Sequence, residues 1–250
     1  MLMERIHAGR IDAPRRVVLY GVHGVGKSSW ASCAPAPIFL PTEEGLNDLD
    51  VAKFPLLTRY ADVLQAIDEL YQSAHDFKTL VIDSADWLER LIWDDVCRKE
   101  QVESIEEIGY AKGYTFALDR WREVLAGIDA LRRERAMHAV LIAHSKIERF
   151  ESPETESYDR YSPKLHKHAA ALVQEWADEV LFACYRVMTR ATDEGFGKER
   201  TRGLGTGERL LRTTERPAHL AKNRLDLPDE LPLLWDAYAS HFTPALAATT

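Results

Sequence analysis

A glycine-rich motif between an apolar run and a short helical segment constrains the fold of this chain more than any other feature. The run Arg15–Tyr20 predicts a buried strand, residues 21–28 have the sequence GVHGVGKS, and a helix is expected from Lys27 to about Cys33. These residues match the pattern G-x-x-x-x-G-K-[ST] in full. Backbone N–H groups at the start of such a helix bind the oxygens of a phosphate chain. The motif therefore predicts an α/β domain that binds a nucleoside triphosphate.

The side chains of this motif predict how the triphosphate and its metal ion are held. Lys27 is expected to reach the β- and γ-phosphates, and the hydroxyl of Ser28 is expected to bind Mg²⁺. Asp83 follows the apolar run Thr79–Ile82 and is expected to support the same ion, through water. The alternative for Asp83 is an aspartate at the N-terminus of a helix, directly before Ser84. The predicted nucleotide-binding residues are Gly21, Val22, His23, Gly24, Val25, Gly26, Lys27, Ser28 and Ser29.

Polar residues also follow two other predicted strands. Glu43 and Glu44 come just after the short strand Ile38–Leu40, and His144 ends the buried strand Ala139–Ala143. Ligands of open α/β sheets bind at the carboxyl ends of the strands, where a carboxylate can orient an attacking water. The alternatives are a solvated turn for the glutamates and a structural histidine.

The remaining pattern predicts a mostly parallel central sheet flanked by helices, with an antiparallel extension at its C-terminal edge. Residues 145–162 are polar without a period and predict a long loop, and Ser162-Pro163 predicts the N-cap and first position of a helix. We expect one core domain, residues 15–240, between a lead-in (1–14) and a tail (241–250). Further helices are predicted around 60–71, 84–102 and 114–131, strands at 180–187, 209–213 and 218–221, and a glycine-rich hairpin at 195–207.

Composition excludes several classes of protein. The net charge of −8, from 32 basic and 40 acidic residues, argues against coating duplex DNA through bulk charge. Three cysteines stand far apart and predict neither a disulfide framework nor a zinc site. No apolar run reaches the roughly 18 residues of a membrane span. We therefore expect a soluble cytoplasmic protein with no membrane partner.

The order of these motifs resembles the RecA-type ATPases, and the whole chain looks like the phage-encoded RecA-core ATP-binding proteins that promote single-strand annealing and recombination. The resemblance covers roughly residues 15–235. It rests on GVHGVGKSS at 21–29, TEEGL at 42–46, VIDS at 81–84, AH at 143–144 and AKNR at 221–224.

The resemblance implies a role for each matched residue. Glu43 takes the place of the catalytic glutamate, with Glu44 beside it, and His144 takes that of the γ-phosphate sensor, where the family usually has glutamine. Lys222 and Arg224 match the lysine and arginine fingers that reach the γ-phosphate of a neighbouring subunit. ATP and Mg²⁺ are then the expected cofactors, in a ring or filament with the nucleotide between subunits. A basic strand end on the surface is the alternative for the two fingers.

In such proteins the segment after the sensor strand contacts single-stranded DNA. The expected DNA-binding residues here are Arg149, Phe150, Tyr158, Arg160, Tyr161, Lys164 and Lys167, with rings for base stacking and cations for phosphates. Charges over residues 145–168 balance, which also fits a mobile mixed-charge loop. Residues 186–224 carry a basic excess that fits a DNA groove, a subunit contact or protection of a sheet edge.

The sequence thus predicts a slow, DNA-stimulated ATPase that binds single-stranded DNA and promotes annealing or homologous recombination, with a single-strand-binding protein as a further partner. A phage origin would place it in the cytoplasm of a bacterial host. Two alternatives remain open. One is a P-loop kinase of a small molecule, which needs lid arginines that act in cis. The other is a non-catalytic module that uses ATP as an assembly switch.

Overall fold

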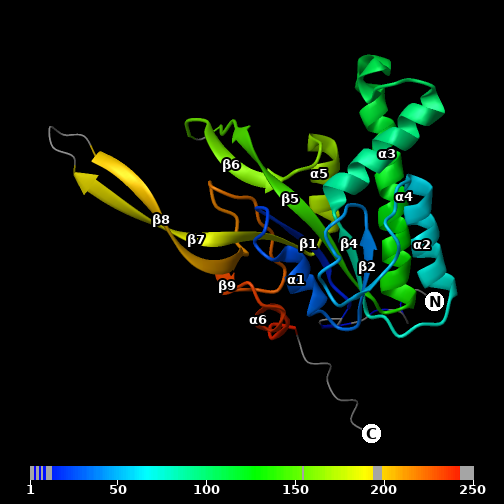
Figure 1. Ribbon diagram of the computed structural model, residues 1–250, viewed down its shortest axis with the longest axis horizontal. Helices are drawn as coiled ribbons and strands as arrows, with labels where there is room; N and C mark the ends of the chain where they lie inside the picture. The colour runs from blue at the N-terminus through cyan, green and yellow to red at the C-terminus, as the bar shows by residue number, and fades with distance from the viewer. Residues whose placement is uncertain are drawn as a thin grey trace, which may run out of the picture.

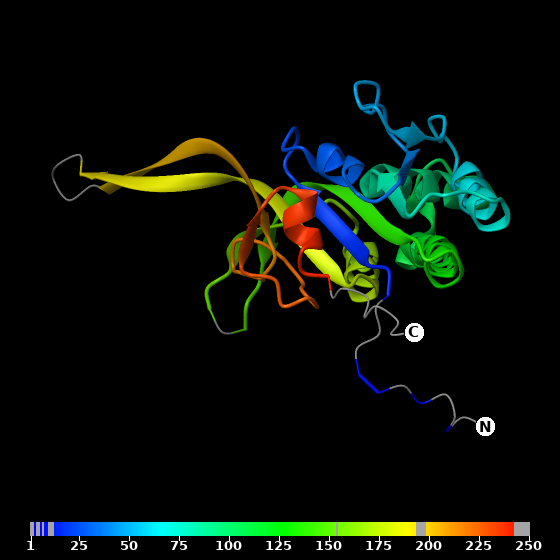
Figure 2. The same ribbon diagram turned by 90° about the horizontal axis from the view of Figure 1, so that it is seen from below.

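Six parallel strands form the centre of one sheet in the computed structural model, which describes residues 13–153, 155–193 and 199–242 and four positions (3, 6, 8 and 9) before them. The side chains of residues 188–206 are not among those that the structure describes. Along the sheet the strand order is β3-β2-β4-β5-β1-β7-β8-β9, and β6 pairs with β5 (Figures 1 and 2). The strands are β1 (Arg16–Gly21), β2 (Pro37–Pro41), β3 (Ala52–Lys53), β4 (Thr79–Asp83), β5 (His138–Phe150), β6 (Tyr158–Pro163), β7 (Glu179–Asp193), β8 (Glu199–Arg212) and β9 (Glu230–Pro232).

Helices cover both faces of this sheet because its central strands are apolar on both sides. One face of β1, β2 and β4 packs against α2 to α5, and the other packs against α1 and α6. Val18 and Tyr20 of β1 belong to the first layer, and Val17 and Leu19 to the second, as the alternation of a strand requires. The helices are α1 (Lys27–Ser32), α2 (Tyr60–Gln72), α3 (Ala85–Glu100), α4 (Lys112–Glu134), α5 (Lys167–Trp176) and α6 (Trp235–Ala239), with 3₁₀ turns η2 (Ile105–Glu107) and η3 (Gly109–Ala111).

This topology confirms the predicted fold class, a mostly parallel α/β sheet with flanking helices and an antiparallel edge at its C-terminal side. Because β1, β2, β4, β5 and β7 run in parallel, their carboxyl ends meet at one edge. The described residues from 13 to 242 contribute to this single sheet and its covering helices. The predicted lead-in and tail fall largely outside the described residues, and so do residues 194–198 of the predicted glycine-rich hairpin.

The predicted long loop over residues 145–162 is wrong. Strand β5 continues past His144 to Phe150, and β6 returns antiparallel to it, with Ser145 opposite Pro163 and Phe150 opposite Tyr158 (Figure 1). Both faces of this hairpin are largely polar, so the sequence lacks the alternation that marks a half-buried strand.

The predicted start of the next helix at Ser162-Pro163 is wrong for the same reason. Ser162 and Pro163 belong to the β5–β6 ladder, and α5 begins only at Lys167 with His166 at its N-cap. At the C-terminal edge, β7 and β8 form a longer antiparallel ribbon than predicted, which projects from the sheet (Figure 2). The predicted strand at residues 218–221 is not formed, and within it only His219 makes isolated bridges, with Tyr161 and with Arg216.

Candidate functional site

The loop between β1 and α1 requires glycine at several positions. Gly24 and Gly26 have φ angles of 70° and 102°, in the left-handed region that favours glycine. At Gly21 a Cβ atom would lie 2.1 Å from the carbonyl oxygen of Ala183 on the neighbouring strand β7. The glycines therefore let β1 approach β7 closely and let the loop turn sharply into the N-terminus of α1.

Lys27 opens α1 and its ammonium group is folded against this loop. The side chain is 7% exposed, and Nζ donates hydrogen bonds to the carbonyl oxygens of Gly21 (3.1 Å) and Val22 (3.0 Å). Burial lowers the pKa of Lys27, and the negative charge of Asp83 partly offsets this effect. The amine is held by neutral carbonyl groups, which an anionic phosphate can replace at a gain in Coulomb energy.

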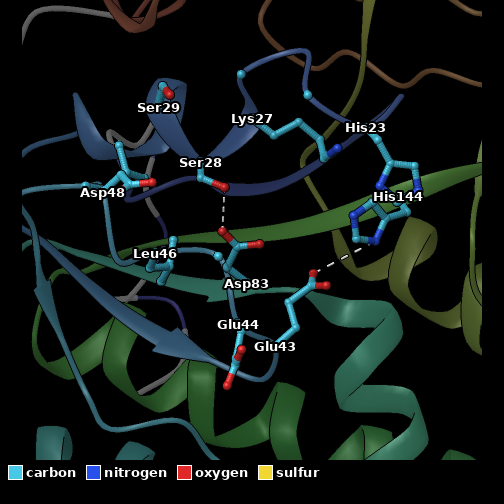
Figure 3. A pocket seen from close by; sticks show the side chains of 14 residues that line it. His23, Lys27, Ser28, Ser29, Glu43, Glu44, Leu46, Asp48, Asp83 and His144 are labelled. Atoms are coloured by element: carbon cyan, nitrogen blue, oxygen red, sulfur yellow. Dashed lines mark hydrogen bonds and ion pairs between the residues drawn. The ribbon is translucent and has the colours of Figure 1, made fainter.

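Ser28 and Asp83 bring together two oxygen-bearing groups that can ligate a metal ion, near the carboxyl ends of β1 and β4. The hydroxyl of Ser28 donates to Oδ2 of Asp83 over 2.6 Å (Figure 3). Burial raises the pKa of Asp83, against the hydrogen bond from Ser28 and the charge of Lys27. A hydroxyl and one carboxylate next to a phosphate-binding loop fit Mg²⁺, which proteins bind through few carboxylates together with substrate phosphates.

The turn after β2 is tied to the end of β4, and this fixes Glu43. The Thr42 hydroxyl donates to the carbonyl oxygen of Ser84 (2.7 Å), and the Ser84 N–H donates to the Thr42 hydroxyl (2.9 Å). Glu43 then extends toward His144, with Oε1 3.9 Å from Nδ1 of the ring, whereas Glu44 extends away from it (Figure 3). The two neighbouring glutamates thus have different surroundings, and Glu43 is the one beside the strand-end histidine.

His144 is held by a residue that sequence reasoning missed. The carboxylate of Asp86, near the start of α3, accepts from the backbone N–H of His144 (3.0 Å) and lies 3.0 Å from Nδ1. Burial alone would raise the pKa of Asp86, but its hydrogen bonds with His144 outweigh burial and lower it. The ring also stacks on His23 of the phosphate loop at 4.1 Å, and the charge of His144 lowers the pKa of His23.

These residues surround one open pocket of about 490 Å³. The pocket combines the phosphate loop, the strand-end groups Asp83 and His144, and the turn of residues 43–49 (Figure 3). Its volume accommodates a nucleoside triphosphate, and Leu46 and Leu49 give one wall an apolar character suited to a base. The lining residues are His23, Gly24, Gly26, Lys27, Ser28, Ser29, Glu43, Glu44, Gly45, Leu46, Asp48, Leu49, Asp83 and His144.

Two residues of the β7–β8 ribbon also contact the phosphate loop and were not predicted. The Tyr185 hydroxyl donates to the carbonyl oxygen of Gly24 over 3.1 Å. The guanidinium of Arg209 lies against Gly26, 2.8 Å from the position that a Cβ atom would take there. No sequence signal linked these residues to the motif, because the contacts arise from strand pairing. The spacing Asp83-x-x-Asp86 at the start of a helix was the one signal that could have found Asp86.

Lys222 and Arg224 do not line the nucleotide pocket. Nζ of Lys222 donates to three carbonyl oxygens at the C-terminal end of α5, those of Gln174 (2.8 Å), Glu175 (3.1 Å) and Ala177 (2.5 Å). Arg224 pairs with Asp178 at 3.2 Å. Within one chain these two cations therefore stabilise the connection between α5 and β7.

The residues predicted to bind DNA divide into three groups. Tyr161 is partly buried against the core, with its ring stacked 5.0 Å from that of Phe182. Phe150 and Tyr158 contact each other at the tip of the hairpin, and Arg160 lies over the ring of Phe150 (4.1 Å). The exposed cations of this set are Arg149, Lys164 and Lys167.

Part of the basic excess over residues 186–224 is neutralised within the chain. Arg186 pairs with Glu208 (2.6 Å) and Glu230 (2.7 Å), Arg212 also pairs with Glu230, and Arg216 pairs with Asp229. Other charged side chains of the segment lie outside those that the structure describes, namely Arg190, Asp193, Glu194, Lys198, Glu199, Arg200 and Arg202.

Comparisons with known proteins match most of the chain. A protein-family model described as an AAA domain matches residues 13–225, which include the whole nucleotide pocket, Lys222 and Arg224. The SPbeta prophage-derived uncharacterized protein YorG of Bacillus subtilis (strain 168) is 24% identical over 221 residues, which are 85% of this chain and 60% of YorG. The chain thus spans less than two thirds of that relative. The crystal structure of the RadB recombinase aligns with a TM-score of 0.42 at 12% identity, over 80% of this chain and 89% of that one.

None of the helices within the described ranges is both long enough and apolar enough to cross a membrane.

Proposed function

The chain belongs to the AAA domain family, and from this premise we propose that it is a RecA-like ATPase that binds single-stranded DNA and promotes annealing and homologous recombination. The prophage-derived relative supports a phage origin, and so a place of action in the bacterial cytoplasm. A second copy of the chain and a single-strand-binding protein are the proposed protein partners.

The observation that carries the ATPase proposal is the convergence of five side chains on one pocket. Lys27, Ser28, Asp83, Glu43 and His144 come from four separate segments and line the same 490 Å³ cavity. In the proposed reaction Lys27 turns from the loop carbonyls to the phosphates, and Ser28 and Asp83 hold Mg²⁺. When bound, Mg²⁺ offsets the negative charge of the phosphate groups.

Glu43 is the proposed general base. Its carboxylate orients a water molecule toward the γ-phosphorus and accepts its proton as the bond to the leaving ADP breaks. His144 lies 3.9 Å from this carboxylate, so its ring is placed to respond to the γ-phosphate. Asp86 lies closer to the same ring nitrogen, with Oδ2 3.0 Å from Nδ1, and fixes the orientation of the ring.

The link to DNA is proposed through the β5–β6 hairpin. His144 and Ser145 are consecutive, and Ser145 already belongs to the hairpin ladder. A movement of His144 in response to nucleotide is therefore transmitted directly to the hairpin, which carries Arg149, Phe150 and Tyr158. The exposed cation Arg149 and the half-buried rings of Phe150 and Tyr158 suit the phosphates and bases of a single strand.

One observation favours a second candidate, a P-loop kinase of a small molecule. Arg209 of β8 reaches Gly26 within the same chain, which is what a lid arginine acting in cis would do. The kinase produces ADP only when a phosphate acceptor is present, without any dependence on DNA. The assembly switch, in contrast, binds ATP and turns over none of it.

The test is ATP turnover by the full chain with and without single-stranded DNA, at low and high salt, together with annealing of fluorescently labelled complementary strands. We expect turnover to be stimulated by DNA and the stimulation to weaken with salt, because phosphate contacts release counterions. Lys27→Ala should abolish turnover, while the matched surface variant Lys78→Ala should not change it. ATP binding without any effect of DNA on turnover or annealing would contradict the proposal.

The variant Glu43→Gln separates the ATPase from the switch. It keeps the shape of the side chain and removes its basicity, so we expect retained ATP binding with turnover reduced by about 100-fold or more. Wild-type protein that binds ATP and shows no turnover under any of these conditions would support the switch. ADP production that depends on an added metabolite would support the kinase.

A further inference from the structure

A second cavity, of about 320 Å³, lies next to the nucleotide pocket. It is formed by α3, the root of the β5–β6 hairpin and the segment of residues 164–166. Asp86 lines this cavity and also holds His144, which lines the nucleotide pocket. Lys164 lines it as well, and its charge lowers the pKa of His23 in the phosphate loop. The two cavities are therefore close enough to influence each other.

A buried carboxyl group with an unused acceptor lines this cavity. Glu89 is 4% exposed, and its Oε2 accepts from the backbone N–H of His166 over 2.8 Å. Its Oε1 is buried and has no hydrogen-bond partner among the described residues. The indole N–H of Trp121 is nearby, but its geometry falls short of a hydrogen bond. A buried acceptor of this kind is costly unless a donor satisfies it.

The rest of the cavity has aromatic rings on one side and lysine side chains at its entrance. Trp93, Tyr114 and His166 form one aromatic group, in which the Tyr114 and His166 rings stack in parallel at 4.0 Å and Trp93 meets Tyr114 edge-on at 5.7 Å. Lys164 is exposed, and its ammonium group has no hydrogen-bond or ion-pair partner among the described residues. Lys146 also lines the cavity and donates to the carbonyl oxygen of Leu165 over 2.8 Å.

We propose that this cavity receives cytosine or adenine of single-stranded nucleic acid, the bases that carry an amino group where thymine and guanine have the O4 and O6 carbonyl oxygens. The amino group donates to Oε1 of Glu89, the ring lies against Trp93 and His166, and the flanking phosphates lie near Lys164, Lys146 and Arg90. The inference rests on the DNA binding proposed above and adds to it a site and a base preference that the hairpin residues do not provide.

The charges of the cavity favour this occupant over a basic peptide side chain. A lysine or arginine would satisfy Glu89, but it would enter past Arg90 and Lys164, which line the same cavity and repel it. The third lining cation, Lys146, is already paired with Glu148. A nucleotide fits these charges, because its base is a neutral, planar donor that would lie inside the cavity. Its negatively charged phosphates would lie outside, near the cations. A carboxylate oxygen accepts from the amino group of cytosine, whereas thymine presents a carbonyl oxygen at the same place.

The experiment measures binding of the full chain, with ATP and Mg²⁺, to labelled oligodeoxycytidylate and oligothymidylate of about 16 nucleotides. Wild-type protein is expected to prefer oligodeoxycytidylate by about tenfold. Glu89→Gln keeps an acceptor for the N–H of His166 and offers an NH₂ donor in place of Oε1, so the preference should disappear or reverse toward thymine. The matched variant Glu69→Gln, on the exposed face of α2, should retain the wild-type preference.

A second variant tests the cavity without touching its buried part. Lys164→Ala should weaken binding of both oligonucleotides and make binding less dependent on salt by about one counterion, whereas Lys78→Ala should change neither. Binding of wild-type protein with no preference, or an unchanged preference in folded Glu89→Gln, would overturn this inference and leave the proposed DNA binding intact. No binding of either oligonucleotide at low salt would overturn both.

Discussion

Asp86 holds His144 at two points, because its carboxylate accepts from the backbone N–H over 3.0 Å and lies 3.0 Å from Nδ1 of the ring. One carboxylate near the start of α3 therefore fixes both the end of the apolar part of β5 and the direction of the imidazole. Such a partner sets which ring nitrogen carries the proton.

Asp86→Asn is expected to lower ATP turnover by about tenfold and to shift its pH dependence. The amide still accepts from the backbone N–H, but its NH₂ group replaces an acceptor beside Nδ1 and favours the other tautomer. The measurement is turnover against pH for the wild type, Asp86→Asn and the control Asp94→Asn, which changes an exposed residue of the same helix. A pH profile identical to that of the wild type would exclude a positioning role for Asp86.

Gly21→Ala is expected to destabilise the protein by about 3 kcal/mol or more. The added methyl group would press against backbone atoms, which cannot move aside as a flexible side chain can. The added Cβ would lie 2.1 Å from the carbonyl oxygen of Ala183. Gly109→Ala is the matched control, because no atom lies within 4 Å of its added Cβ. Urea denaturation compares the two variants. Equal midpoints would show that β1 and β7 can move apart at Gly21 without loss of stability.

The sequence predicted the parts of this structure that depend on local patterns. The phosphate loop needs its glycines at fixed positions, and Asp83, Glu43 and His144 each follow an apolar run, so the rule for strand ends placed all three at one edge. The contacts of Asp86 with His144 and of Arg209 with Gly26 depend on how distant segments meet, which no local pattern records.

The hairpin shows why a polar segment can hide a strand. Ile147 is 63% exposed, and its neighbours Lys146 and Glu148 form an ion pair (3.2 Å) on the ladder, so neither face has the apolar alternation of a core strand. Ser162 and Pro163 also have the residue types of a helix start. Their pairing with Lys146 and Ser145 outweighs that preference.

The contribution of Glu89 to the stability of the wild type is expected to fall as pH rises from 4.5 to about 7. Burial raises the pKa of Glu89 from 4.5 to about 7, so over that range the folded state binds a proton that the unfolded state releases. This contribution is complete below pH 4.5 and is lost as pH passes the folded pKa, at a cost of up to about 3 kcal/mol. Chemical denaturation at several pH values should show a smaller fall in Glu89→Gln and the full fall in Glu69→Gln.

Tyr20→Phe is expected to cost about 1 to 2 kcal/mol of stability. The buried hydroxyl of Tyr20 donates to the carbonyl oxygen of Leu220 (2.5 Å) and lies 3.2 Å from that of Tyr161. Its removal leaves a buried carbonyl without this donor and loosens the segment before Lys222 from β1. Thermal unfolding measures the loss, and a midpoint equal to the wild type would show that another donor replaces the hydroxyl.

The proposed action of Lys222 and Arg224 on a neighbouring subunit predicts complementation between two inactive variants. Lys222→Ala removes the cation and keeps the phosphate loop, whereas Lys27→Ala disables the loop and keeps the cation. In an equimolar mixture, about one interface in four joins an intact loop to an intact cation, so turnover should recover to about a quarter of the wild-type rate.

Because Lys222 also binds three carbonyl oxygens at the end of α5, its loss alone could act through folding. Recovery in the mixture excludes that explanation, since the active loops then belong to the Lys222→Ala subunits themselves. A mixture no more active than its components, with both variants folded and assembled, would assign Lys222 to the α5 connection alone.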